Sequence, residues 1–580
     1  MLQRLAIAMG VAAAALASAG SHLAARRNPA VQRLAREYVS AYFERNPQLG
    51  MVFGWPGADE TPLPDHSLAA EAAWQAREDA LREELGRLDP ASLEGSDRIE
   101  AALLRERLDG FRDARVCRSE LWPVSSIWGW QQQFPQMGNG MRVDTPEARR
   151  RALARWRDIP RWLDQEVMTL QEGIRRGYTS SRSNVESALA QIDTVLSTPP
   201  ERSPLATWAD RARDEPFARE VRVVVAERIV PAAKRYQEFL ARDYLPAARA
   251  SDAVAANPNG AACYRALLRV HTGLDLSPQA VHDLGLRQME AIEAEMRSVV
   301  ARSFGGAELP RVFEQLRSDP RYTFRSREEI VERARSALER ARVAMPRWFG
   351  ITTSRDVELV PYPETLERGA PGGSYRAGGR DRSGTYFVNT ATPRERSVAD
   401  AEAIAFHEMI PGHHLQISIA LERAGDRLVA VYLPQTTFTE GWGLYAERLA
   451  DEMGLYSGDV DRLGMLSMQA LRAARLVVDS GVHGLGWTRE QAIRYLAEHT
   501  SMPRAVIAAE VDRYIASPGQ ATAYMIGMLE IRGIRAEAER ALGARFDVKA
   551  FHDRVLEGGA VSLPLLREKI EGWVRDGGKP

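Results

Sequence analysis

The stretch AFHEMIPGHHLQI (residues 405–417) holds three of the ten histidines of the chain, and Glu408 directly follows the first of them. On a helix of about 3.6 residues per turn, neighbouring side chains diverge by about one hundred degrees. This divergence allows His407 to bind a metal ion while Glu408 acts as general base on a water molecule. The usual motif places a second histidine one turn later, but position 411 holds proline. The stretch therefore indicates a metal site whose second histidine is displaced.

Two histidines compete for that second position. Pro411 has no N–H to donate and Gly412 allows backbone angles that other residues avoid, so together they can end the helical turn and return His413 toward His407. His414 shares a face with His407 only if the helix continues, and seven residues of helix separate the two by about 10.5 Å. We favour His413 as the second ligand and keep His414 as the alternative.

A third ligand is needed because catalytic zinc usually takes three protein ligands and keeps one position for water. Glu440 lies near the start of a helical run that follows Pro434 and is the candidate. Glu447 is seven residues further on, faces the same way and is placed to hold a ligand histidine. The helix dipole alone also explains a glutamate near a helix start, so the assignment of Glu440 depends on the histidines.

Most of the chain carries helical patterns. Residues 184–197, 284–304 and 327–349 repeat apolar side chains at spacings of three and four, with charged residues between them. A capping box over residues 397–400 predicts that the helix carrying His407 begins there. These patterns predict a mainly α fold.

A small β-sheet is expected directly upstream of the histidines. Residues 356–363 and 384–389 are short runs rich in valine, tyrosine and phenylalanine, and a glycine-rich connection joins them. The expected fold class is therefore mainly α, with a small sheet beside the candidate site.

Charge and the N-terminal segment restrict the class of protein. Lys and Arg number 77 against 78 for Asp and Glu, a formal charge of −1 that offers no general attraction for nucleic acid. Residues 1–19 have one positive charge, a short apolar run and a small-residue cleavage pattern, as in a signal peptide. No cysteine lies near that cleavage point, which argues against a lipid anchor, and Cys117 and Cys263 allow at most one disulfide. We expect export to the periplasm or secretion, with no membrane span after cleavage.

Two segments offer a donor for an oxyanion. Gln520 and Tyr524 share a helix face, and the Tyr524 hydroxyl is a candidate donor to substrate; packing against another helix is the alternative. His483 is the other candidate, with Asp479 one turn before it as an orienting partner. A structural ion-pair ladder explains the same spacing.

Four further residues are candidates for substrate binding. Tyr386 and Asn389 lie on the second predicted strand, which as an edge strand could pair with an extended peptide. Gln520 lies beside Tyr524, and Arg532 is a candidate for binding a substrate carboxylate because guanidinium matches carboxylate in a fork. A solvated helix arginine is the alternative for Arg532.

The segments HEMIPGHHLQ (407–416), TEGWGLYAERLADEMG (439–454), PGQATAYMIGMLEIR (518–532) and FHDRVLEGGAVSLPLL (551–566) together resemble the bacterial "domain of unknown function 885" family. That family is grouped with the glutamate-zincin relatives of HExxH metallopeptidases, in an HExxPGHH variant. The resemblance implies His407, His413 and Glu440 as ligands of one zinc ion and Glu408 as base. It also implies a large helical metallopeptidase-like fold with a small sheet beside an active-site cleft.

On this basis we expect residues 20–350 to form a mostly helical wall of the cleft, and residues 351–580 to hold the sheet and the metal site. The expected function is an exported zinc-dependent peptidase that hydrolyses peptide bonds. Two alternatives stay open: a metal-dependent amidase acting on cell-wall or other non-peptide amides, and a non-catalytic binding protein on a metallopeptidase scaffold. The sequence leaves open endo- or exopeptidase action, side-chain preference, other divalent metals and the oligomeric state.

Overall fold

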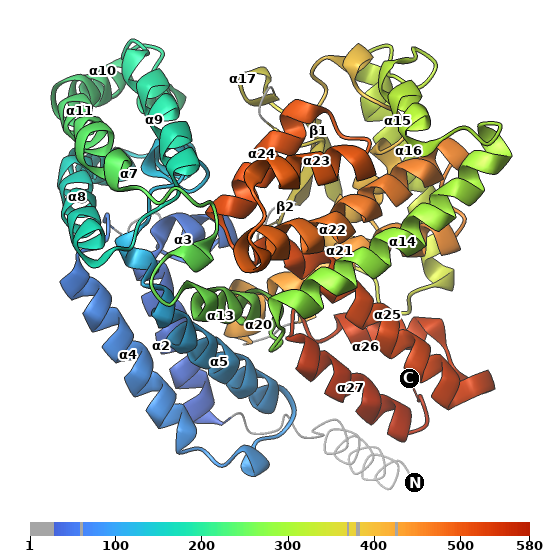
Figure 1. Ribbon diagram of the computed structural model, residues 1–580. Coiled ribbons are helices and arrows are strands. Elements are labelled where there is room, and N and C mark those ends of the chain that lie inside the picture. Colours follow the sequence, from blue (N-terminus) through green and yellow to red (C-terminus); the bar gives the residue numbers. More distant parts are fainter. Residues whose placement is uncertain (1–27, 59–61, 368–369, 379–382, 424–426, 580) are drawn as a thin grey trace, which may run out of the picture.

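A computed structural model describes residues 28–58, 62–367, 370–378, 383–423 and 427–579. The signal peptide predicted over residues 1–19 lies outside these ranges. The described chain is mainly helical with one small three-stranded sheet, so the predicted fold class is confirmed (Figure 1). No helix within these ranges is both long enough and apolar enough to cross a membrane.

Before the sheet, the regular elements of the described residues are helices. The N-terminal helices are α2 (Pro29–Arg45), α3 (Pro47–Phe53), α4 (Leu68–Gly86) and α5 (Gly95–Ala114). They are followed by α6 (Trp130–Gly140), α7 (Pro146–Arg157), α8 (Ile159–Arg176), α9 (Arg182–Ser197), α10 (Glu215–Val224), α11 (Val230–Phe239) and α12 (Leu245–Ala247). Four more precede the sheet: α13 (Gly260–Thr272), α14 (Pro278–Ser303), α15 (Leu309–Ser318) and α16 (Arg327–Ala344).

The second half begins with the sheet and returns to helices. The strands are β1 (Val357–Pro361), β2 (Gly373–Arg376) and β3 (Gly384–Val388), with the short α17 (Glu364–Glu367) between the first two. The helices that follow are α18 (Ala401–Glu408), α19 (His413–Arg423), α20 (Leu428–Tyr432), α21 (Thr436–Glu452), α22 (Asp459–Leu485), α23 (Arg489–His499), α24 (Arg504–Ala516), α25 (Ala523–Leu542), α26 (Val548–Leu556) and α27 (Leu563–Arg575).

The amphipathic patterns account for the long helices. On α14 the buried residues include Val281, Met289, Ile292 and Met296, which recur at helical spacing and cover one face. This helix runs along α22, the most extensively buried helix of the C-terminal half. The three predicted amphipathic segments correspond to α9, α14 and α16. The third was predicted to reach residue 349, but α16 ends at Ala344 and a 3₁₀ turn, Met345–Arg347, follows it.

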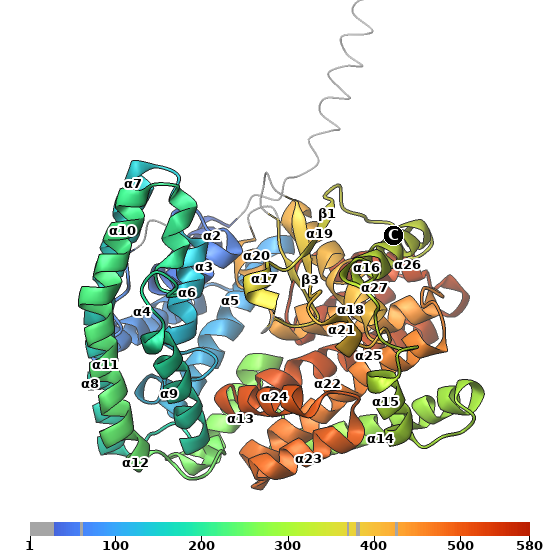
Figure 2. The same ribbon diagram turned by 90° about the horizontal axis from the view of Figure 1, so that it is seen from above.

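The described residues form two hydrophobic clusters. One draws on Leu63 and on helices α6 to α11, which stand together at the left of Figure 1. The other combines the N-terminal helices with α13 to α16, the sheet and the C-terminal helices. The two views in Figures 1 and 2 show the first group packed to one side of the second.

A disulfide joins the two ends of the segment that contains the first group. Cys117 and Cys263 are bonded, and both side chains are buried in the second cluster. This is the single disulfide that the two cysteines allow. It closes the segment 118–262, which includes α6 to α12, at the point where that segment leaves and re-enters the larger cluster.

The sheet has the order β1–β3–β2, with β1 parallel and β2 antiparallel to β3. β1 and β3 are the two strands that the sequence predicted. β2 lies within the glycine-rich connection between those two runs and was not predicted. Because β2 covers one side of β3, the prediction that β3 is an edge strand is wrong.

Candidate metal centre

The turn between α18 and α19 returns His413 to His407. Helix α18 ends at Glu408, a cis peptide precedes Pro411, and α19 begins at His413. A Cβ atom at Gly412 would lie 1.9 Å from the His407 carbonyl oxygen, so only glycine fits here. The two imidazole rings lie 4.6 Å apart between centroids, at 82° to each other.

The start of α18 differs from the prediction. Its first residue is Ala401, with Asp400 at the N-cap, and no side chain caps it. The Ser397 hydroxyl instead accepts from the Ala399 N–H and forms a local turn. The capping box expected at residues 397–400 is therefore wrong, although the helix itself is present.

Glu440 on α21 joins the two histidines. Its Oε2 lies 3.5 Å from His407 Nε2 and 3.6 Å from His413 Nε2, and the three ligand atoms all lie within 4.8 Å of one another. Hydrogen bonds to an imidazole nitrogen are normally about 2.7–3.2 Å long. Atoms about 2.0–2.2 Å from one zinc ion at tetrahedral angles lie about 3.3–3.6 Å apart. The donor types and their spacing therefore fit one shared divalent ion.

A glycine on α21 makes room for both rings. A Cβ atom at Gly443, one turn after Glu440, would lie 2.7 Å from His407 Nε2 and 3.0 Å from His413 Cε1. Even alanine would have to displace the imidazoles. Helix α21 thus supplies the Glu440 carboxylate and, at Gly443, the room that the two imidazole rings occupy.

Glu447, two turns after Glu440, fixes the orientation of His407. The His407 Nδ1–H donates to Glu447 Oε1 at 2.8 Å, which leaves Nε2 to face Glu440. Glu447 is fully buried, and its other oxygen accepts from the Gln469 amide at 3.1 Å. Arg472 Nη2 lies 3.6 Å from Glu447 Oε1.

The electrostatics of the cluster favour a positive charge. Burial alone lowers the pKa of His407, but Glu440 and Glu447 outweigh burial and raise that pKa to about 9. The same interaction with the histidines lowers the pKa of Glu440, against the effect of burial. The site is thus built to hold either a proton or a metal cation among these side chains.

His414 is turned away from this cluster. Its Nε2–H donates to the Arg355 carbonyl at 3.2 Å, and its Nδ1 accepts from the Tyr375 hydroxyl at 3.1 Å. Because both ring nitrogens are bonded elsewhere, the geometry brings His413, and not His414, to His407 and Glu440.

Glu408 lies next to the cluster and contacts the edge of the sheet. Its Oε2 accepts from the Tyr375 N–H of β2 at 2.8 Å. Burial raises the pKa of Glu408, while His413 and His407 oppose the rise. Tyr375 therefore links this carboxylate and His414, a role that sequence analysis missed because the residue lies in the glycine-rich segment.

Tyr524 on α25 lies within electrostatic reach of the cluster. Burial raises the pKa of its hydroxyl, and the charge of Glu440 raises it further, so the hydroxyl keeps its proton near neutral pH. The guanidinium of Arg475 stacks on the Tyr524 ring, 4.6 Å from its centroid. The hydroxyl can thus act as a hydrogen-bond donor within electrostatic reach of Glu440.

His483 does not suit the role predicted for it. Its Nδ1 accepts from the Val254 N–H at 3.1 Å and its Nε2–H donates to the Tyr514 carbonyl at 3.0 Å. Asp479 does not orient it, because that carboxylate accepts from the Tyr264 hydroxyl and from the Gly519 N–H. Both ring nitrogens of His483 are committed to the protein, so neither is left for an oxyanion.

The two strand residues predicted to bind substrate are buried structural residues. Tyr386 is 1% exposed, on the central strand. The Asn389 amide donates to the carbonyls of Glu367 and Ala370 and holds the loop after α17. Both predictions fail because β2 covers the edge of β3.

Gln520 and Arg532, the other two candidates for substrate binding, lie at different distances from Tyr524. Gln520 is partly exposed in a short 3₁₀ turn, Gln520–Thr522, directly before α25, and its Oε1 accepts from Arg513. Arg532 is exposed near Arg448 and Glu452, about 12 Å further along α25 than Tyr524. Only Gln520 adjoins the Tyr524 segment.

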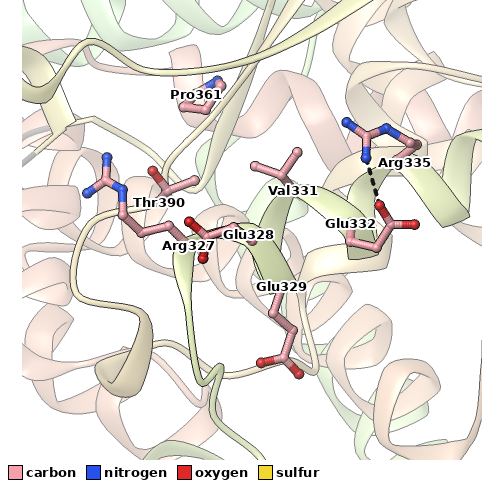
Figure 3. A pocket seen from close by; sticks show the side chains of 8 residues that line it. All are labelled: Arg327, Glu328, Glu329, Val331, Glu332, Arg335, Pro361 and Thr390. Atoms are coloured by element: carbon pink, nitrogen blue, oxygen red, sulfur yellow. Dashed lines mark hydrogen bonds and ion pairs between the residues drawn. The ribbon is translucent and has the colours of Figure 1, made fainter.

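A surface pocket of about 650 Å³ lies at the N-terminal end of α16, and none of the predicted site residues is in its lining. Figure 3 shows its side chains: Arg327, Glu328, Glu329, Val331, Glu332, Arg335, Pro361 and Thr390. Arg327 is held by Glu367, and Arg335 by Glu332. Because none of the candidate catalytic or metal-binding residues lines this pocket, we assign it no role.

The fold and the site define a class: a large, mainly helical protein with a small sheet and a buried His–His–Glu cluster. The chain belongs to the family described as "Bacterial protein of unknown function (DUF885)", whose profile matches residues 47–570. The family resemblance seen in the sequence is thus confirmed. No curated protein matched the chain.

Two solved structures share the fold. A protein described as "the putative lipoprotein from Colwellia psychrerythraea" superposes with a TM-score of 0.88 at 24% identity, over 94% of this chain and 99% of its own. A second, described as "a putative lipoprotein of unknown function from Shewanella oneidensis", gives 0.68 at 18% identity, over 93% and 99%. At these identities the likeness establishes the fold alone.

Proposed function

We propose that the chain is a metal-dependent peptidase that binds one zinc ion through His407, His413 and Glu440. The observation that carries the proposal is the convergence of two imidazole nitrogens and one carboxylate oxygen at 3.5 and 3.6 Å, too long for direct hydrogen bonds and suited to a shared ion. The proposed relationship to HExxH metallopeptidases adds support, because it assigns the same three residues.

When bound, a zinc ion supplies a Lewis acid that polarises a carbonyl group and lowers the pKa of a water molecule. His407 and His413 would hold it through Nε2 and Glu440 through Oε2. Glu447 accepts the Nδ1–H of His407, so that on binding the ion would take the place of a proton at Nε2.

Glu408 is the proposed general base. The Tyr375 N–H holds its Oε2, and we assign Oε1 to take a proton from the attacking water and to pass it to the departing amine. A pKa raised by burial makes this carboxylate a better proton acceptor than an exposed one. The Tyr524 hydroxyl is the proposed donor to the oxyanion.

Export is supported by the sequence of residues 1–19 and by the disulfide. A bond between Cys117 and Cys263 is typical of a protein that folds in an oxidising compartment. We therefore place the enzyme in the periplasm or among secreted proteins.

The test is a peptide-library digest with wild type and Glu408→Gln, paired with metal analysis of both. We expect hydrolysis to fall about 10²- to 10⁴-fold in the variant, since a general base contributes about that much, while zinc content stays unchanged. Glu422→Gln on α19 is the matched control, because Glu422 is bonded to residues 353–355, and we expect this variant to keep full activity. Full hydrolysis by a zinc-loaded Glu408→Gln protein would contradict the mechanism.

A further inference from the structure

A column of alternating cations and aromatic rings leads away from the metal centre. Arg475 of α22 lies between two rings, 4.6 Å from the centroid of Tyr524 and 5.8 Å from that of Tyr514. Arg513 lies over Tyr514 at 4.9 Å. The supporting helices α22, α24 and α25 are neighbours, and α24 lies on the side that faces α9 (Figures 1 and 2).

This column carries more positive than negative charge. Glu510 is shared by two guanidinium groups, at 2.8 Å from Arg475 and 3.0 Å from Arg513. Arg475 is only 7% exposed, and its Nη1 has no acceptor among the described residues. Two buried or half-buried arginines with one carboxylate leave a net positive charge beside Tyr524.

The neighbouring acids do not cancel this charge. Glu447 is opposite Arg472, and Glu440 belongs to the metal centre. Asp479 lies within electrostatic reach of Arg513, but burial raises its pKa to about 7, so it is only partly charged at neutral pH. An anionic ligand group is therefore favoured at this end of the site.

Two donors lie ready at the exposed end of the column. Arg513 and Gln520 are both partly exposed, and Arg513 Nη1 donates to Gln520 Oε1 at 2.5 Å. Nη1 carries a second hydrogen, and holding Oε1 fixes the direction of the Gln520 NH₂ group. Adjacent N–H donors of this kind match the two oxygens of a carboxylate.

We propose that Arg513 and Gln520 bind a carboxylate of the substrate beside Tyr524. This inference rests on the proposed peptidase function and adds a substrate class, namely peptides that carry a carboxylate near the bond to be cleaved. That carboxylate is either the free C-terminus of the peptide or an acidic side chain.

The test measures binding, so that it does not depend on turnover. Three peptides of one sequence are titrated by calorimetry into zinc-loaded Glu408→Gln protein: a free acid, its C-terminal amide, and the amide with one glutamate added. We expect the free acid or the glutamate amide to bind at least about tenfold more tightly than the plain amide, since a hydrogen bond to a charged group supports a difference of that size. Whichever peptide binds tightly identifies the source of the carboxylate.

Substitutions locate the binding group. Arg513→Gln and Gln520→Met, each in the Glu408→Gln background, should remove the preference; Gln520→Met keeps the Arg513–Glu510 pair and guards against misfolding. Arg489→Gln is the matched control, because Arg489 of α23 forms a similar fork with Asp512 of α24, the helix that carries Arg513. We expect this variant to keep the preference. Equal binding of all three peptides, or a preference that survives both substitutions, would overturn the inference. The proposed function fails separately, if the Glu408→Gln protein still hydrolyses peptides.

Discussion

Two buried clusters in this chain use the same residue types in opposite ways. At the candidate metal centre, His407 and His413 direct Nε2 toward one oxygen of Glu440, at distances too long for ordinary hydrogen bonds. On α22, His483 has both nitrogens bonded to main-chain groups, and Asp479 is bonded to a tyrosine hydroxyl and an N–H. In the first cluster, which we call the open cluster, the ligand atoms face one another and could share an ion. In the second, which we call the closed cluster, the polar atoms are already hydrogen-bonded within the protein.

The pKa shifts follow the same division. His407 is surrounded by carboxylates, and its pKa rises to about 9 in spite of burial. For His483, burial dominates and lowers the pKa to about 4. Sequence spacing cannot separate these cases, because in both an acid lies within one turn of a histidine: Glu408 directly follows His407, and Asp479 precedes His483 by four residues. The bonding of each ring nitrogen separates them.

The largest effect expected from the open cluster, after loss of the base Glu408, is that of Tyr524→Phe. Removing the hydroxyl should lower kcat about 10²- to 10³-fold with little change in KM, as loss of one oxyanion donor does in other enzymes. Steady-state kinetics on one peptide measures this effect. Tyr495→Phe on α23 is the control, and an unchanged kcat in Tyr524→Phe would remove this residue from the mechanism.

A smaller effect is expected from the residue that orients His407. Glu447→Gln should weaken metal binding about 10- to 100-fold, because partners of ligand histidines typically contribute that much. Titration with a competing chelator measures the affinity. Glu452→Gln, at the exposed end of the same helix, should bind metal as the wild type does. Equal affinities for the two variants would show that Glu447 acts only in packing.

The smallest effect on activity is expected from the closed cluster. His483→Gln should leave hydrolysis and metal content unchanged but destabilise the fold by about 1–3 kcal/mol, since it disturbs buried hydrogen bonds. Denaturant unfolding at several pH values checks this expectation. A loss of zinc or of kcat in the folded variant would contradict the structural role of His483.

The same variant also tests how His483 contributes to the pH dependence of the unfolding free energy. Because the pKa of His483 is about 4 when folded, against 6.5 ordinarily, the unfolded chain binds more protons between these values. Its contribution to stability is complete above about pH 6.5 and is lost as the pH falls toward 4. His483→Gln should therefore reduce the slope of unfolding free energy in this range, and an unchanged slope would argue that His483 is protonated in the fold.

Much of the fold was predictable, because helical periodicity and β-rich runs are local signals. The sequence could not show β2, since glycine-rich segments form loops as readily as strands. Missing β2 made Tyr386 and Asn389 look available to substrate, although the sheet buries both.

The residues of the candidate site could be predicted from the sequence, but the course of the backbone between them could not. Spacing nominated His407, Glu440 and either His413 or His414, while the course of the turn at Pro411 and Gly412 depends on backbone geometry that no periodicity encodes. The partners of His483 lie 229 and 31 residues away in the chain, so its helix face alone gave no sign of them.

The central claim is that His407, His413 and Glu440 hold one metal ion, and metal analysis of purified protein tests it most directly. We expect about one zinc ion per chain in the wild type, little or none in Glu440→Ala, and full occupancy in His414→Gln, because His414 is bonded away from the cluster. A wild-type protein that takes up no stoichiometric divalent metal, or a Glu440→Ala protein that binds it as well as the wild type, would contradict the account.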